Sequence, residues 1–113
     1  MLIAAGESTR MGQLKALLVW EGQPLVRYQS EALLAAPVER VVVVLGYRSD
    51  ALEPLLPSDP RLQVVHNPDY GSGKVSSIVA GVDAVEPTCH VLILGVDQPR
   101  AAATIRTVCE AHV

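Results

Sequence analysis

Residues 6–15, Gly-Glu-Ser-Thr-Arg-Met-Gly-Gln-Leu-Lys, are of types that suit binding of a polyphosphate. Gly6 and Gly12 let the backbone come close to a ligand, because glycine carries no Cβ. Arg10 can hold two phosphate oxygens at once through its planar guanidinium, and Lys15 adds a mobile point charge. We interpret the segment as a phosphate-binding loop, and the alternative is a solvated surface loop whose cations face water.

The glycine spacing of this loop excludes two common motifs. The dinucleotide-binding pattern G-x-G-x-x-G does not fit Gly6 and Gly12. The nucleophile elbow G-x-S-x-G would need a glycine where Arg10 stands. The loop therefore predicts neither a dinucleotide fingerprint nor a hydrolase serine.

A second glycine-lysine pair, Gly73-Lys74, resembles the end of a Walker A loop but does not satisfy it. Pro68 stands where the first glycine belongs, and Val75 replaces the Ser or Thr that should follow the lysine. Ser76 and Ser77 come next, at a predicted helix start whose unpaired N–H groups can attract an anion. Plain helix capping is the alternative for this segment.

Asp97 follows an apolar run and precedes Gln98-Pro99, a place from which a carboxylate can hold Mg²⁺. Magnesium prefers oxygen ligands and commonly takes only one or two from the protein beside substrate phosphates. A turn former or helix cap is the alternative for this aspartate. The histidines lack partners at metal-ligand spacing, and we expect them to pack in the core or on the surface. They are His66, His90 and His112.

Short apolar runs precede these candidate residues and are expected to be strands, because they are too short and too β-branched for helices. The runs cover residues 1–5, 41–45, 62–65 and 91–94. Segments with helical spacing of apolar residues separate them, and they cover 22–36, 49–57, 74–85 and the stretch after Pro99. This alternation predicts an α/β fold with a parallel sheet. Because ligands of such sheets bind beyond the carboxyl ends of the strands, we expect the loops there to form one site.

The composition agrees with one aliphatic domain. The chain has 113 residues, of which 50% are hydrophobic, and it contains no Phe. A net charge of -3 lacks the basic excess of a nucleic-acid or anionic-membrane binder, so neither partner is expected. No apolar stretch approaches the roughly 20 residues that span a bilayer, and no basic signal-peptide start precedes the first run, so we expect a cytoplasmic protein. Cys89 and Cys109 are expected to be reduced core residues.

Residues 3–12 together with Lys15 resemble the signature L-A-A-G-x-S-x-R-M-G-x-x-K of the MobA-like nucleotidyltransferases, most closely the molybdenum cofactor cytidylyltransferase branch. Further matches follow in the family's order at 17–18, 22–25, 41–46, 67–70, 76–77 and 97–99. The resemblance implies a Rossmann-like three-layer sandwich with a mostly parallel sheet. It covers essentially the whole chain but not the whole family domain, so residues 1–113 are expected to be its N-terminal portion.

The resemblance also implies roles for single residues. Main-chain contacts to the base and ribose are implied for Ile3, Ala4, Ala5 and Gly6. Arg10 and Lys15 would hold the triphosphate, and Asp97 would bind Mg²⁺, so these three are the implied catalytic residues. Positions that border the nucleotide, or cap a phosphate or the base, are implied for Gly46, Asn67, Ser76 and Ser77.

The implied reaction is Mg²⁺-dependent transfer of CMP from CTP to molybdopterin with release of pyrophosphate. Ala5-Gly6 resembles the cytidylyl type, whereas guanylyltransferase relatives tend to show Gly-Gly. The alternatives are a nucleotide-binding fragment without turnover, and a related transferase that uses GTP or another phosphorylated acceptor. An NAD-type binder is disfavoured by the failed glycine pattern. A sheet that ended with this chain would expose an edge and apolar helix faces, so association with another copy is a further expectation.

Overall fold

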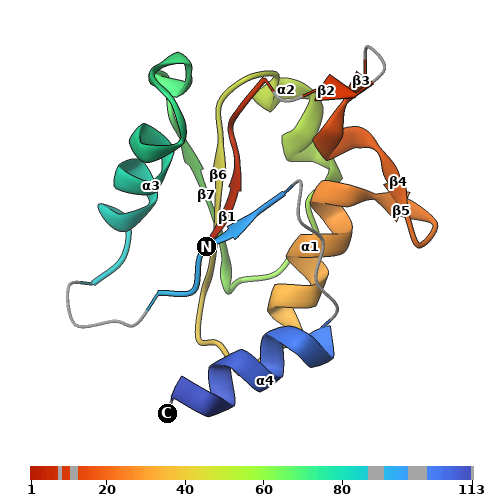
Figure 1. Ribbon diagram of the computed structural model, residues 1–113, viewed down its shortest axis with the longest axis vertical. Coiled ribbons are helices and arrows are strands. Elements are labelled where there is room, and N and C mark those ends of the chain that lie inside the picture. Colours follow the sequence, from red (N-terminus) through yellow and green to blue (C-terminus); the bar gives the residue numbers. More distant parts are fainter. Residues whose placement is uncertain (8, 11–12, 87–90, 97–101, 113) are drawn as a thin grey trace.

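The computed structural model describes residues 1–7, 9–10, 13–86, 91–96 and 102–112. Within these ranges a parallel sheet has the strand order β7-β6-β1-β8 (Figure 1). Its strands are β1 (Leu2–Ala4), β6 (Val41–Leu45), β7 (Leu62–His66) and β8 (Leu94–Gly95). Short antiparallel pairs are formed by β2 (Thr9–Arg10) with β3 (Gln13–Leu14) and by β4 (Val19–Trp20) with β5 (Gln23–Pro24).

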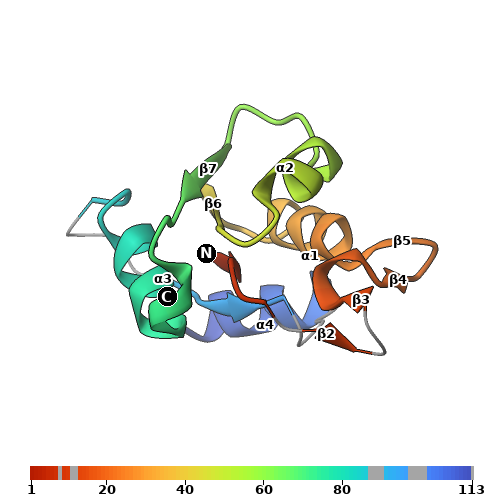
Figure 2. The ribbon, with the colours of Figure 1, turned by 90° about the horizontal axis from the view of Figure 1, so that it is seen from above.

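Helices cover both faces of the sheet. The α-helices are α1 (Leu25–Leu34), α2 (Ser49–Leu52), α3 (Lys74–Val82) and α4 (Ala102–His112). The 3₁₀ helices are η1 (Lys15–Leu17), η2 (Glu53–Leu55) and η3 (Tyr70–Ser72). The view from above shows α3 on one side of the sheet and α1 with α4 on the other (Figure 2). The described part of the chain is therefore a three-layer α/β sandwich, as the sequence predicts.

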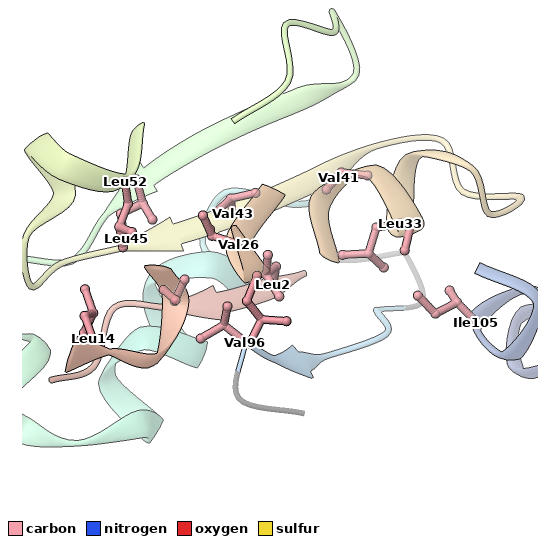
Figure 3. Packing of buried hydrophobic residues seen from close by; sticks show 14 of the residues in the cluster. Leu2, Leu14, Val26, Leu33, Val41, Val43, Leu45, Leu52, Val96 and Ile105 are labelled. Atoms are coloured by element: carbon pink, nitrogen blue, oxygen red, sulfur yellow. The ribbon is translucent and has the colours of Figure 1, made fainter. Parts of the chain in front are cut away.

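Alternation along the central strands builds a separate core on each face. In β6, Val43 and Leu45 pack with Leu2 on the side of α1, and Figure 3 shows this cluster at close range. Val42 and Val44 pack on the side of α3. All five residues of β6 are buried, which explains why the segment is a continuous Val and Leu run. Burial of each such side chain contributes about 1.5–3 kcal/mol.

The predicted start of the first helix is wrong by three residues. Gln23 and Pro24 pair with Val19–Trp20 in a hairpin, and α1 begins at Leu25. The hairpin turn is Glu21-Gly22, and both residues have positive φ, 53° and 82°. Such a two-residue turn matches the twist of paired strands, and glycine at its second position makes it accessible.

The predicted strand over 91–94 is wrong in most of its length, because only Leu94 and Gly95 pair with β1. The register places Leu94 opposite Leu2, and the N–H of Leu94 donates to the carbonyl of Met1 at 2.8 Å. Residues 91–93 are irregular in the structure, although the amine of Met1 donates to the carbonyl of Leu92 at 2.7 Å.

The other described helices agree with the apolar spacing. The segment expected at 49–57 forms α2 and then η2, and α3 begins at Lys74 as predicted. No helix in the described ranges is long and apolar enough to cross a membrane.

Candidate functional site

A cleft of about 520 Å³ lies at the carboxyl ends of β1 and β8. In Figure 1 the loops after β1 and β7 both lie at the upper end of the sheet, where these strands end. The lining residues come from three separate stretches of sequence. They are Ile3, Ala4, Gly6, Glu7, Leu14, Lys15, Ala16, Tyr70, Gly71, Gly73, Lys74, Gly95 and Val96. The predicted convergence of strand-end loops is therefore confirmed for the loops after β1, β7 and β8.

Two lysines from different loops face this cleft. Lys15 begins η1 and is half-buried, whereas Lys74 begins α3 and is exposed. In the part of the chain that the structure describes, neither ammonium group has a hydrogen-bond or ion-pair partner. Glu7 is the acidic residue that lines the same cleft. A concave site with more cations than anions attracts an anionic ligand.

Gly46 lies directly after β6, as predicted, but it is packed between strand ends rather than in the cleft. A Cβ at this position would lie 2.7 Å from the Cβ of Tyr70 and 3.0 Å from the carbonyl oxygens of Ala5 and Asn67. The lack of a side chain therefore lets the ends of β1, β6 and β7 approach one another. Ala5 is buried beside it, and its carbonyl accepts the N–H of Tyr47 at 2.9 Å.

Asn67 connects the end of β7 to the start of α3. Its side chain is buried, and its Nδ2 donates to the Oγ of Ser76 at 3.0 Å and of Ser77 at 2.9 Å. Its Oδ1 accepts the N–H of Asp69 at 2.9 Å, and Ser76 Oγ lies 2.7 Å from the carbonyl of Gly73. These side chains thus bond to one another and brace the cleft-lining segment 70–74. Direct contact of Asn67, Ser76 or Ser77 with a nucleotide stays a prediction.

The arrangement of this cleft agrees with a family assignment from the sequence. The model of the MobA-like NTP transferase domain matches residues 1–113. The chain belongs to the MobA-like NTP transferase family.

Curated relatives of this MobA-like chain carry several names. The molybdenum cofactor cytidylyltransferase of Escherichia coli (strain K12) is 34% identical over 88% of this chain and 50% of that protein. The nicotine blue oxidoreductase of Paenarthrobacter nicotinovorans is 37% identical over 92% of this chain and 51% of that protein. A molybdenum cofactor guanylyltransferase of Xanthomonas euvesicatoria is 38% identical over 93% of this chain and 49% of that protein. The chain spans about half the length of these relatives.

Solved structures support the fold. A nucleotidyl transferase from Methanothermobacter superposes with a TM-score of 0.82 and 30% identity, over 96% of this chain and 55% of that one. The MobA-like fold of the described residues is therefore shared with this nucleotidyl transferase.

Of the predicted MobA-like catalytic residues, Arg10 is described only in its backbone, and Asp97 lies outside the described residues. The backbone of Arg10 is in β2 and pairs with Gln13 of β3, so the hairpin leads the chain back to Lys15. Asp97 is outside the described ranges, and the residue before it, Val96, lines the cleft. The described ranges contain no group of three His, Cys, Asp or Glu side chains that would form a metal site by themselves.

His66 lies on the surface and Cys109 packs against the core, in agreement with the positions expected for these residue types. His66 Nε2 lies 3.0 Å from Glu53 Oε1 in an exposed pair at the end of β7. Cys109 is a free, half-buried thiol that packs against the main core. Cys89 and His90 lie outside the described residues, and for His112 only the backbone is described.

Sequence reasoning missed Lys74 and Gln29 as parts of the site. The sequence around Lys74 does not satisfy the Walker A pattern, so Lys74 was not predicted as a site residue. The position of Lys74 after a loop at the end of a strand was a sufficient signal that it lies at the cleft. Gln29 is wholly buried, and its Nε2 donates to the carbonyls of Gly95 at 3.2 Å and Val96 at 3.3 Å. The signal for Gln29 was an amide among the mostly apolar residues of the buried face of α1.

Proposed function

We propose that residues 1–113 form the N-terminal, nucleotide-binding portion of a nucleotidyltransferase domain that transfers CMP from CTP to molybdopterin. The observation that supports this most is the cleft that both Lys15 and Lys74 line, where neither ammonium group has a hydrogen-bond or ion-pair partner among the described residues. A triphosphate supplies the anionic groups that such a site attracts. The E. coli relative, named a molybdenum cofactor cytidylyltransferase, supports the choice of CTP and of this acceptor.

The donor nucleotide would lie along the end of β1. Ile3, Ala4 and Gly6 line the cleft, where their main chain can contact the base and ribose. Lys15, together with Arg10, would hold the triphosphate and stabilise the charge that develops on the leaving pyrophosphate.

A carboxylate in the cleft lining and one that follows the lining in sequence would suit a magnesium ion. Glu7 lines the cleft, and Asp97 follows Val96, which also lines it. Carboxylate oxygens are the ligands that Mg²⁺ takes from proteins, usually few in number beside substrate phosphates. When bound by Asp97, magnesium would neutralise phosphate charge and orient the triphosphate.

The chemistry needs no covalent intermediate on the protein. An oxygen of the acceptor phosphate attacks the α-phosphorus of CTP, the bond from this phosphorus to the bridging oxygen breaks, and pyrophosphate leaves. Such a transfer depends on positioning and on charge stabilisation. The cleft lining contains no Ser or Cys among its described residues, which agrees with direct transfer.

Binding measurements test the donor site. We would titrate the purified chain with CTP, GTP, ATP and NADH by calorimetry, with and without Mg²⁺. Magnesium-dependent preference for CTP is expected. Preference for GTP would instead favour the guanylyl reaction, which the 38% identity to the Xanthomonas guanylyltransferase makes the second candidate. Preference for NADH without a metal requirement would overturn the proposal and favour a reaction like that of the nicotine blue oxidoreductase relative.

Turnover is tested separately with molybdopterin as the acceptor. Release of pyrophosphate only when CTP, Mg²⁺ and molybdopterin are all present would support transfer. Binding of CTP without any release would leave this chain a nucleotide-binding module, because it spans about half the length of the relatives.

A further inference from the structure

Gln29 is a fully buried amide in a place where packing alone would favour an apolar residue. It lies on the inner face of α1, and its exposed fraction is 0%, as is that of Val26. A buried amide costs free energy unless its polar atoms find partners. Its Nε2 finds them outside the helix, at the carbonyl oxygens of Gly95 (3.2 Å) and Val96 (3.3 Å).

These two carbonyls lie at the end of β8, on its last residue, Gly95, and on the next residue, Val96. The strand is only two residues long and lies at an edge of the described sheet. Backbone bonds to β1 hold it through the N–H groups of Leu94 and Val96, which donate to Met1 and Ile3. The amide of Gln29 adds a constraint from the helix layer, at the residues that line the cleft.

We propose that Gln29 is a positioning residue for the nucleotide cleft, which fixes the Gly95-Val96 end of β8 and thereby the point from which the chain continues to Asp97. This inference rests on the proposed function, since Asp97 is the residue proposed there to hold Mg²⁺. Groups that orient metal ligands without touching the metal commonly change metal affinity or activity about 10- to 100-fold when they are replaced.

The variant Gln29→Met tests this role, because methionine keeps the unbranched shape and removes both donated hydrogen bonds. We expect the Mg²⁺ concentration for half-maximal CTP binding to rise about 10- to 100-fold. We also expect the N–H of Val96 to exchange with solvent faster, while the N–H of Val43 in β6 exchanges at an unchanged rate.

Ser30→Ala is the matched control. Ser30 is the next residue of α1, is equally buried, and donates its Oγ–H to the carbonyl of Val26 at 2.8 Å within the helix. This variant removes a buried hydrogen bond of α1 that does not reach the cleft. It is expected to change neither the Mg²⁺ dependence of CTP binding nor the exchange of Val96.

The possible outcomes separate this inference from the proposed function. Absence of CTP binding by the unaltered chain would overturn the proposed function. Normal CTP binding by the unaltered chain, with the same Mg²⁺ dependence in Gln29→Met, would overturn the positioning role alone. Unchanged exchange of Val96 in the variant would also overturn it, whether or not CTP binds.

A measurement on the unaltered chain covers the case in which Gln29→Met does not fold. The side-chain NH₂ resonances of Gln29 should shift when Mg²⁺ and CTP are added, although the residue has no solvent exposure. The backbone resonance of Val42, a strand residue whose side chain packs in the core on the opposite face of the sheet, should stay unchanged. A Gln29 signal that does not respond to saturating Mg²⁺ and CTP would contradict the proposal.

Discussion

Lys15 is the described cation on which the proposed donor site depends most, because it is half-buried in the cleft wall and has no ion-pair partner in the described ranges. A hydrogen bond to a charged group contributes about 1.5–3 kcal/mol. We therefore expect Lys15→Ala to weaken binding of Mg²⁺ and CTP about 10- to 100-fold in a calorimetric titration. Arg40→Ala removes the same charge from the residue before β6, at the amino-terminal end of that strand and away from the cleft, and should leave the affinity unchanged.

Lys74 lies across the cleft and is exposed, so water screens its charge and a smaller effect is expected. Lys74→Gln should weaken CTP binding about three- to tenfold, equivalent to about 1 kcal/mol. The loss should shrink as NaCl is raised from low to physiological concentration, which a titration series at several salt concentrations measures. An affinity that is unchanged even at low salt would remove Lys74 from the site.

Asp97 is proposed to hold the metal, so its replacement should act on turnover more than on folding. Asp97→Ala is expected to abolish Mg²⁺-dependent pyrophosphate release in the presence of CTP and molybdopterin. The thermal midpoint of the chain should change little, which excludes unfolding as the cause. Near-normal cytidylyl transfer by this variant would refute the metal assignment.

At the scale of elements, the ends of three strands meet at Gly46, and the close approach of their backbones determines how the cleft is braced. Gly46→Ala would place a methyl group 2.7 Å from the Cβ of Tyr70 and 3.0 Å from two backbone carbonyls, which side-chain rotation cannot relieve. We expect a loss of about 1–3 kcal/mol in the free energy of unfolding, measured with urea.

Gly71→Ala is the control for this prediction, because no atom lies within 4 Å of a Cβ at that position. Its free energy of unfolding should stay the same or rise slightly, since alanine restricts the unfolded chain. Equal stability of the two variants would show that the strand ends can separate without cost.

At the scale of the whole molecule, the buried α-amine of Met1, which donates to the carbonyl of Leu92, makes the stability of the chain depend on pH. Burial lowers the pKa of this amine from 8.0 to about 6, and the nearby Cys109 acts in the opposite direction. Above pH 8 the amine is neutral in both the folded and the unfolded chain. As the pH falls toward 6 the unfolded chain binds the proton first, so the folded chain loses stability.

We expect the free energy of unfolding of the 113-residue chain to fall by about 2 kcal/mol between pH 8 and pH 6. Urea unfolding at a series of pH values measures this slope. A chain with an acetylated amine cannot bind the proton at this group and should show a flatter profile. Identical profiles for the free and acetylated chains would contradict the assignment.

The sequence by itself determined the elements whose signals are local. The Val run at 41–45 could only be a buried strand, and the apolar spacing from Lys74 onward could only be a helix. It also determined where the loops meet. Parallel strands have their carboxyl ends on the same side of the sheet, and the loops that follow them therefore lie together. The motif around Gly6, Arg10 and Lys15 was enough for the family.

Only the tertiary structure decided the features that depend on neighbours distant in sequence. Leu94 and Gly95 pair with Leu2 and Ile3 of β1, and no local pattern at 91–94 contains the information for that pairing. The bonds from the Asn67 amide to Ser76 and Ser77 form because α3 packs beside the end of β7, and the sequence does not show them. Helix packing on the sheet also brings Lys74 to the cleft and Gln29 to the carbonyls of Gly95 and Val96. These groups are far apart in the sequence.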